Sequence, residues 1–228
     1  TGPASSSLLG GTVNVSGAQL SSTSTADLVI SPGGALTFNG GTHTLYLDWE
    51  GELSDLVHRQ RQFRAGMGIV WPVVYRRMSL PLVRDFDAIQ KLVVRHEIGL
   101  VIVDSAMPAV GVAEGDPGFP VKELMGALRE LAVTSFIVAH IAAMERNVAH
   151  PKSYGSVFWN NLSRSAWHIK KSQESDKNVT EILLQHVKAN FSALQDPIGL
   201  RWEFRPWEEA VTVKCKAPEE MEGLAENI

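Results

Sequence analysis

Three apolar segments of this sequence each end in a side chain that can bind a cation or move a proton. The segments and their polar ends are "TLYLDWE" (44–50) with Asp48 and Glu50, "GLVIVD" (99–104) with Asp104, and "TSFIVAH" (134–140) with His140. A carboxylate at the end of a buried strand is costly unless it is paired or bound to a cation. The three ends together therefore indicate a hydrated metal–phosphate site.

Each of these polar residues suits one part of such a site. An aspartate after four apolar residues is the Walker B pattern, so Asp104 is predicted to hold Mg²⁺ through water. Glu50 could polarise an attacking water, and His140 could sense a γ-phosphate. Simpler interpretations stay open for each residue: Asp104 as a turn or capping residue, Glu50 as a solvated strand end, and His140 as an ordinary core or turn histidine.

The segments that must position these residues alternate between strand and helix patterns. Strands are predicted at 44–50, 73–82, 100–104 and 134–140, and helices at 51–66, 84–99 and 121–132, with a Gly- and Pro-rich loop between residues 104 and 121. Near-continuous apolar strands separated by helices favour an α/β fold with a mostly parallel sheet and helices on both faces. In such sheets ligands gather at the carboxyl ends of the strands.

The last third of the chain changes character. Strands at 164–171, 180–190, 199–206 and 210–216 follow one another with hairpin-like links. We expect them to form a C-terminal antiparallel β extension at one edge of the parallel sheet.

Composition divides the chain into three regions. Residues 1–43 form a Ser/Thr/Gly-rich arm with Asp27 as its one formally charged residue, which predicts irregular structure or short strands. Residues 44–216 have the composition of an ordinary globular domain, and residues 217–228 form an acidic tail.

The bulk properties of the 228-residue chain exclude some classes of protein. A formal net charge of −4 gives no overall basic footprint for nucleic acid, although local basic patches are compatible with it. No apolar run is long enough to span a membrane, and no signal peptide is recognisable. The single cysteine, Cys215, predicts a reducing, cytoplasmic location. The missing initiator methionine suggests a fragment or a processed chain.

Five segments, in this order, resemble the RecA-like ATPase core. They are "TLYLDWEGE", "GLVIVDSAMPA", "SFIVAHI", "YGSVFWNNLSRSAWHIKK" and "LLQHVKANFSALQDPIGLRWEF". The resemblance covers about residues 44–216 and is closest to the hexameric helicase branch of the RepA and DnaB type. Proteins of this branch are often AAA-family ATPases of phages, plasmids and mobile elements that act in DNA replication.

The resemblance implies roles for individual residues. Glu50 matches the glutamate that activates the hydrolytic water, Asp104 the Walker B aspartate with Ser105 beside it, and His140 the sensor. The implied cofactors are ATP and Mg²⁺, and the implied assembly is a homo-oligomeric ring. Cations that reach the nucleotide of the neighbouring subunit are matched by Arg164, Lys170 and Lys171.

A loop that faces the channel of such rings and can touch single-stranded DNA is matched by residues 149–161. The resemblance assigns the nucleic-acid contacts to Lys152, Tyr154, Ser156 and Trp159. The segment 150–164 interleaves aromatic side chains with cations, which suits stacking of bases over a phosphate track: His150, Lys152, Tyr154, Phe158, Trp159 and Arg164. The open alternative is a packing loop in which Phe158 and Trp159 lie in the core. Likewise, "WHIKK" could be a strand with a solvated basic end.

The sequence departs from the RecA-like pattern in one respect. A P-loop, with a lysine that reaches the β- and γ-phosphates, should precede the strand at residue 44, but the first lysine is Lys91. The nearest mimic, "GALTFNGGT" (34–42), has the wrong spacing and carries Gly41 where the lysine belongs.

Several interpretations follow from the missing P-loop. The chain could be a fragment or a degenerate copy of an ATPase that binds ATP weakly and hydrolyses it slowly or not at all. It could instead be a non-hydrolysing RecA-like scaffold that oligomerises or binds single-stranded nucleic acid. A third alternative is an α/β protein that takes no nucleotide and matches the family by chance.

Overall fold

The computed structural model describes residues 43–69, 72–111, 118–141, 158–171 and 177–221, together with the backbone of four short strands nearer the N-terminus. Those strands form a small sheet of order β1-β4-β2-β3: β1 (Ser6–Ser7), β2 (Gln19–Ser24), β3 (Asp27–Ser31) and β4 (Thr37–Phe38). Across the described residues, no helix has the length and apolar character needed to cross a membrane.

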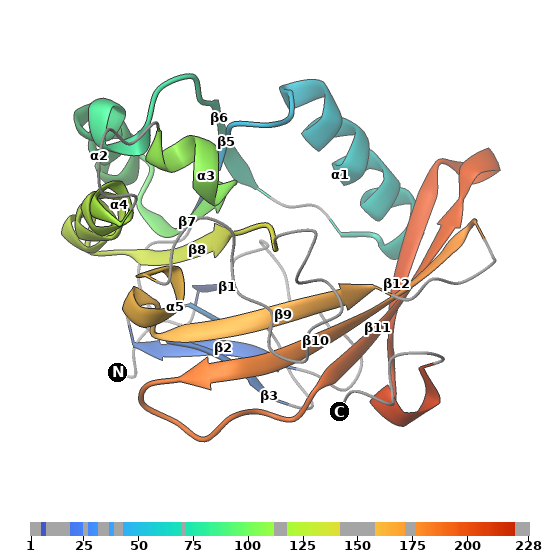
Figure 1. Ribbon diagram of the computed structural model, residues 1–228. Helices are drawn as coiled ribbons and strands as arrows, with labels where there is room; N and C mark the ends of the chain where they lie inside the picture. The colour runs from blue at the N-terminus through green and yellow to red at the C-terminus, as the bar shows by residue number, and fades with distance from the viewer. Residues whose placement is uncertain are drawn as a thin grey trace, which may run out of the picture.

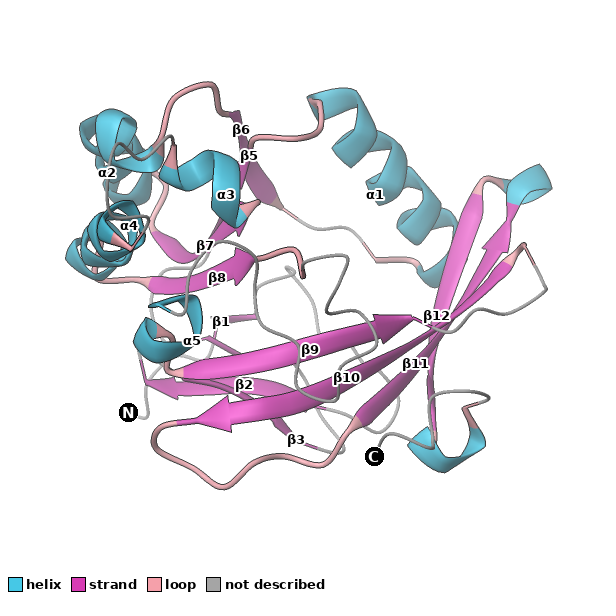
Figure 2. Ribbon diagram, viewed as in Figure 1, coloured by secondary structure: helices cyan, strands magenta, loops and turns pink. Residues whose placement is uncertain are grey.

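A four-stranded parallel sheet forms the first half of the globular region (Figures 1 and 2). Its strands have the order β6-β5-β7-β8: β5 (His43–Asp48), β6 (Val73–Arg77), β7 (Ile98–Asp104) and β8 (Thr134–Val138). Parallel neighbours need crossover connections. These contain α1 (Leu53–Met67), α2 (Phe86–Arg95) and α4 (Phe119–Glu130). The predicted α/β fold with a parallel sheet is confirmed.

The core lies between one face of this sheet and helices α2 and α4. Alternate residues of a strand point to the same face, so Leu45 and Leu47 of β5 lie beside Val101 and Val103 of β7, and all four are fully buried. Ile89 of α2 is buried against the same cluster. Burying each such side chain contributes about 1.5–3 kcal/mol. In Figure 1, α1 lies on the opposite side of β5 and β6 from α2 and α4.

The helices and strands differ from the predicted ranges at several boundaries. Residues Ala106–Val110 form the short helix α3 inside the predicted loop, and Gly111 follows it with φ of 82°. The strand predicted at 73–82 ends at Arg77, and the 3-10 helix η1 (Leu82–Asp85) precedes α2. Pro81 lies immediately before η1, and its carbonyl oxygen accepts the backbone N–H of Arg84 at 3.0 Å.

The last third of the chain forms a second sheet, which corrects the prediction that it extends the first. Its order is β12-β11-β10-β9, with every pair antiparallel: β9 (Ser165–Lys171), β10 (Val179–Ala189), β11 (Ile198–Arg205) and β12 (Ala210–Lys216). Each strand pairs with its neighbours in sequence, because short links allow antiparallel pairing directly. The strand patterns therefore predict the antiparallel strands but not that they form a sheet of their own.

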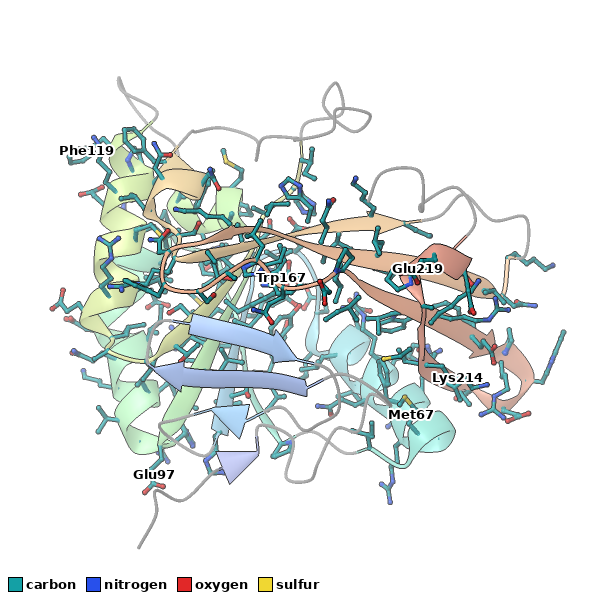
Figure 3. All side chains as sticks on the ribbon, turned by 90° about the horizontal axis from the view of Figure 1, so that it is seen from below. Met67, Glu97, Phe119, Trp167, Lys214 and Glu219 are labelled. Atoms are coloured by element: carbon teal, nitrogen blue, oxygen red, sulfur yellow. The ribbon has the colours of Figure 1, made fainter. Side chains whose placement is uncertain are left out.

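Helix α1, the crossover between β5 and β6, packs against the second sheet. None of its residues is fully buried, and it packs against β12 rather than into the main core. The rings of Phe63 on α1 and Trp202 on β11 meet edge to face, with centroids 5.4 Å apart. Figure 3 labels Met67 at the end of α1 and Lys214 on β12, the two elements that contact each other.

Candidate active site at the carboxyl edge of the parallel sheet

The carboxyl ends of β5, β7 and β8 lie next to one another; we call this rim of the sheet the carboxyl edge. The three strands run parallel, and Asp48, Asp104 and Val138 occupy the same register position. Glu50 lies two residues beyond Asp48, and His140 lies two residues beyond Val138. The register of the sheet thus brings together the three residues predicted to form the site.

Glu50 is the centre of this group. Its Oε1 atom accepts a hydrogen bond from the Ser105 hydroxyl and lies 3.2 Å from Nε2 of His140. Its side chain is 48% exposed and that of His140 is 63% exposed, so water reaches both. The hydrogen bond from Ser105 lowers the pKa of Glu50, burial opposes this, and His140 lowers the pKa further. Glu50 is therefore a carboxylate at neutral pH, the form that accepts a proton.

Asp104 is held by a tyrosine from the neighbouring strand. The Tyr46 hydroxyl donates to Oδ2 of Asp104 at 2.5 Å. Burial and this hydrogen bond raise the pKa of Tyr46, which keeps its proton available for donation. No hydrogen bond to Oδ1 of Asp104 is found among the described residues, so this oxygen can receive a ligand.

Asp48 has a different role from the one that its position at a strand end suggested. It is 4% exposed, and its Oδ1 atom accepts hydrogen bonds from the backbone N–H groups of Glu50, at 2.9 Å, and Gly51, at 2.7 Å. The Tyr75 hydroxyl donates to Oδ2 at 3.2 Å. Burial and Asp48 raise the pKa of Tyr75 to about 12. Asp48 thus shapes the turn that carries Glu50 from β5 into α1.

A cavity of about 90 Å³ opens beside these residues. Four carboxylates and one guanidinium are among its lining groups: Asp48, Glu50, Asp55, Asp104 and Arg59. Because acidic groups predominate in its lining, the cavity favours a cation over an anion.

The fit to Mg²⁺ and to ATP differs. Carboxylate oxygens and water are the ligands that Mg²⁺ prefers. Within the described ranges no three acidic, histidine or cysteine side chains are grouped to hold a metal ion directly. The phosphate chain of ATP finds a single cation, Arg59, in the cavity lining. The carboxyl edge therefore fits the magnesium part of a nucleotide site but supplies little of its phosphate-binding part.

The basic residues predicted to act on a neighbouring subunit lie on the other sheet. Arg164 precedes β9, and its guanidinium lies 5.1 Å from the ring centroid of Phe191. Lys170 and Lys171 end β9 and pair with Leu183 and Ile182 of β10. The structure contains one chain, so their action on a neighbour stays a prediction.

The predicted nucleic-acid loop falls largely outside the described residues, which include neither Lys152 nor Tyr154 nor Ser156. Trp159, in the short helix α5 (Phe158–Leu162), is 5% exposed and belongs to the main core. For Trp159 the core-packing alternative holds, and its indole is not presented to bases.

Sequence reasoning missed Tyr46 and the hydrogen bond from Ser105 to Glu50. Tyr46 lies two residues before Asp48 and so on the same face of β5, a relation that strand periodicity contains. Its contact with Asp104 depends on which strand lies next to β5, and periodicity does not specify that neighbour.

Together, the fold and the carboxyl edge define an α/β protein with acidic residues at the ends of adjacent parallel strands. No protein-family model and no curated protein matches the sequence. Among solved structures, the chain is similar to the crystal structure of the KaiC-like protein PH0186 from the hyperthermophilic archaeon Pyrococcus horikoshii OT3. The TM-score is 0.51 at 11% sequence identity, covering 75% of this chain and 74% of that one. The similarity is one of fold, and the parallel sheet is consistent with a RecA-like core.

Proposed function

We propose that this chain is a RecA-like ATPase-family domain whose carboxyl edge is the magnesium-binding and water-activating part of a nucleotide site. The observation that carries the proposal is the joint position of two carboxylates on adjacent strands. Glu50 is held by Ser105 and His140, and Asp104 has one oxygen free of hydrogen bonds from described residues.

Each residue has one role in this proposal. Asp104 accepts hydrogen bonds from water around Mg²⁺, and Glu50 accepts the proton of a water molecule at the carboxyl edge. His140 orients the Glu50 carboxylate through their contact. Bound Mg²⁺ would supply neutralisation of phosphate charge.

Binding of ATP by this chain is expected to be weak, and hydrolysis slow. The cavity lining contains four acids and one arginine, and no lysine precedes Lys91 in the sequence. Phosphoryl-transfer sites depend on a lysine at the β- and γ-phosphates. The acidic lining favours the second candidate, a non-hydrolysing RecA-like scaffold, if the first fails. Helicase activity in DNA replication, ring assembly and binding of single-stranded DNA remain predictions that rest on the resemblance.

Calorimetric titration of the purified chain tests the proposal. We expect weak binding of ATP with Mg²⁺, and no binding of ATP in excess EDTA. Asp104→Asn should remove the magnesium-dependent binding, whereas Asp87→Asn, an exposed acid on α2, should leave it unchanged.

Two results would contradict the proposal. Binding that is unaffected by EDTA and by Asp104→Asn would move the site away from the carboxyl edge and favour the scaffold. Turnover on the scale of about 1–100 s⁻¹, typical of kinases, would show that this chain has a full phosphate-binding site after all.

A further inference from the structure

Two tyrosines form the same diagonal contact on one face of the parallel sheet. Tyr75 of β6 and Tyr46 of β5 occupy the same register position, with ring centroids 6.0 Å apart. Each hydroxyl donates to the aspartate that lies two residues further along the next strand: Tyr75 to Asp48 and Tyr46 to Asp104. Diagonal neighbours of this kind are within reach of an aromatic side chain.

Asp48 and Asp104 differ in how many of their carboxylate oxygens accept hydrogen bonds from described residues. Asp48 has both oxygens occupied, by Tyr75 and by two backbone N–H groups of the following turn. Asp104 has Oδ2 bonded to Tyr46, and no hydrogen bond from a described residue reaches Oδ1. The Tyr75 contact therefore completes a turn, whereas the Tyr46 contact orients a carboxylate that still has a free oxygen.

We propose that Tyr46 is a positioning residue that orients the Asp104 carboxylate for a divalent cation, while the equivalent Tyr75 is structural. The proposal rests on the proposed function, because it assigns Tyr46 to the same cation site. A tyrosine that bonds one carboxylate oxygen restricts rotation of the group and directs the other oxygen toward the ligand. Hydrogen-bond partners of metal ligands typically change metal affinity by about 10–100-fold when removed.

The test uses Mn²⁺ alone, with free Mn²⁺ measured by electron paramagnetic resonance, on the full 228-residue chain. Four proteins are compared: the unmodified chain, Tyr46→Phe, Tyr75→Phe and Asp104→Ala. Each phenylalanine variant loses one hydroxyl and keeps its ring, so the pair is matched in chemistry and position. We expect Tyr46→Phe to weaken Mn²⁺ binding at least about 10-fold. Tyr75→Phe should stay within about twofold of the unmodified chain, and urea unfolding should show that both variants are folded.

A double variant separates positioning from a general structural effect. Because Tyr46 is inferred to act through Asp104, Tyr46→Phe should have no further effect on Mn²⁺ binding when Asp104 is already alanine. Equal affinities of the unmodified chain and Tyr46→Phe would overturn the inference and leave the proposed function standing. Equal losses in Tyr46→Phe and Tyr75→Phe, or an effect of Tyr46→Phe in the Asp104→Ala background, would also overturn it.

A chain that binds no Mn²⁺ would overturn this inference as well. The titration with ATP and Mg²⁺ then decides the proposed function independently, because that measurement does not depend on Tyr46.

Discussion

At the scale of single residues, hydrogen bonds determine which polar groups are structural and which can act. His186 of β10 illustrates a structural group. It is 6% exposed, stacks on Trp167 at 4.3 Å, and lies 3.0 Å from the Ser165 hydroxyl through Nε2. Its Nδ1 atom accepts the backbone N–H of Gln195 at 3.0 Å, so this nitrogen carries no proton. The folded protein therefore requires neutral His186.

This requirement predicts a pH dependence of stability. Burial lowers the pKa of His186 below its ordinary value of 6.5, while a backbone hydrogen bond at Lys188 opposes the shift. Between the lowered pKa and about 6.5 the unfolded chain binds the proton and the folded chain does not, so stability is full above this window and falls as pH decreases through it. The loss from this group has a maximum slope of about 1.4 kcal/mol per pH unit.

Urea unfolding between pH 7 and pH 5 measures the effect. His186→Gln should lower stability at pH 7 and flatten the pH dependence. His140→Gln, which changes a 63% exposed histidine, should preserve the pH dependence of the unmodified chain. Parallel curves for the unmodified chain and His186→Gln would show that this histidine does not produce it.

At the scale of helices and strands, periodicity predicts the individual elements better than it predicts which elements pair or pack with one another. The apolar run that ends in Asp104 is a buried strand, and the run before His140 contains the half-buried edge strand β8. The parallel register of these strands brings the predicted site together. The sequence could not assign α1 to a partner, because its amphipathic pattern is weak and its packing surface includes a glycine. It also could not show that β9 pairs with β10 in a separate antiparallel sheet, since hydrogen-bond partners depend on tertiary geometry.

The contact of α1 with β12 depends on Gly66. A Cβ atom at Gly66 would lie 2.0 Å from the backbone oxygen of Val211, far closer than atoms can approach. Gly66→Ala is therefore expected to separate α1 from β12 and to lower the unfolding free energy by about 1–3 kcal/mol, even though alanine favours helix. Chemical denaturation followed by tryptophan fluorescence measures this change.

The chain offers a matched control for this substitution. Gly126 lies in α4 with open space around its Cβ position, so Gly126→Ala should stabilise the protein by about 0.5–1 kcal/mol. If both substitutions stabilise the protein, then α1 and β12 are not in close contact.

At the scale of the whole molecule, two helices of the described part of the chain link the parallel and antiparallel sheets. One is α1, which leaves the carboxyl edge and packs on β12. The other is α5, which carries Trp159 into the core of the parallel sheet and leads directly into β9. Helix α1, which lines the cavity at the carboxyl edge with Asp55 and Arg59, therefore also contacts the second sheet.

Lys188 links helix α5 to the antiparallel sheet. It lies on β10, and its Nζ atom donates to the backbone oxygens of Asn160 at 2.5 Å and Ser163 at 2.6 Å, at the end of α5. Burial lowers the pKa of Lys188 from its ordinary value. The last carbonyls of a helix have no partners within the helix, so a cation at this place satisfies them.

Removing the Lys188 cation should lower the unfolding free energy of the parallel and antiparallel sheets together. Hydrogen bonds to a charged group contribute about 1.5–3 kcal/mol each, and Lys188→Met keeps most of the side-chain volume while it removes them. We expect a loss of at least about 1.5 kcal/mol in urea unfolding. Because α5 still packs in the core of the parallel sheet through Trp159 and still leads directly into β9, unfolding should remain a single transition. Lys171→Met, at an exposed position on β9, should change stability by less than about 0.5 kcal/mol.

Two separate transitions in Lys188→Met would show that the two sheets depend on the Lys188 contact with α5 to unfold together. No loss of stability at all would show that, of the two described links, α1 alone joins the sheets.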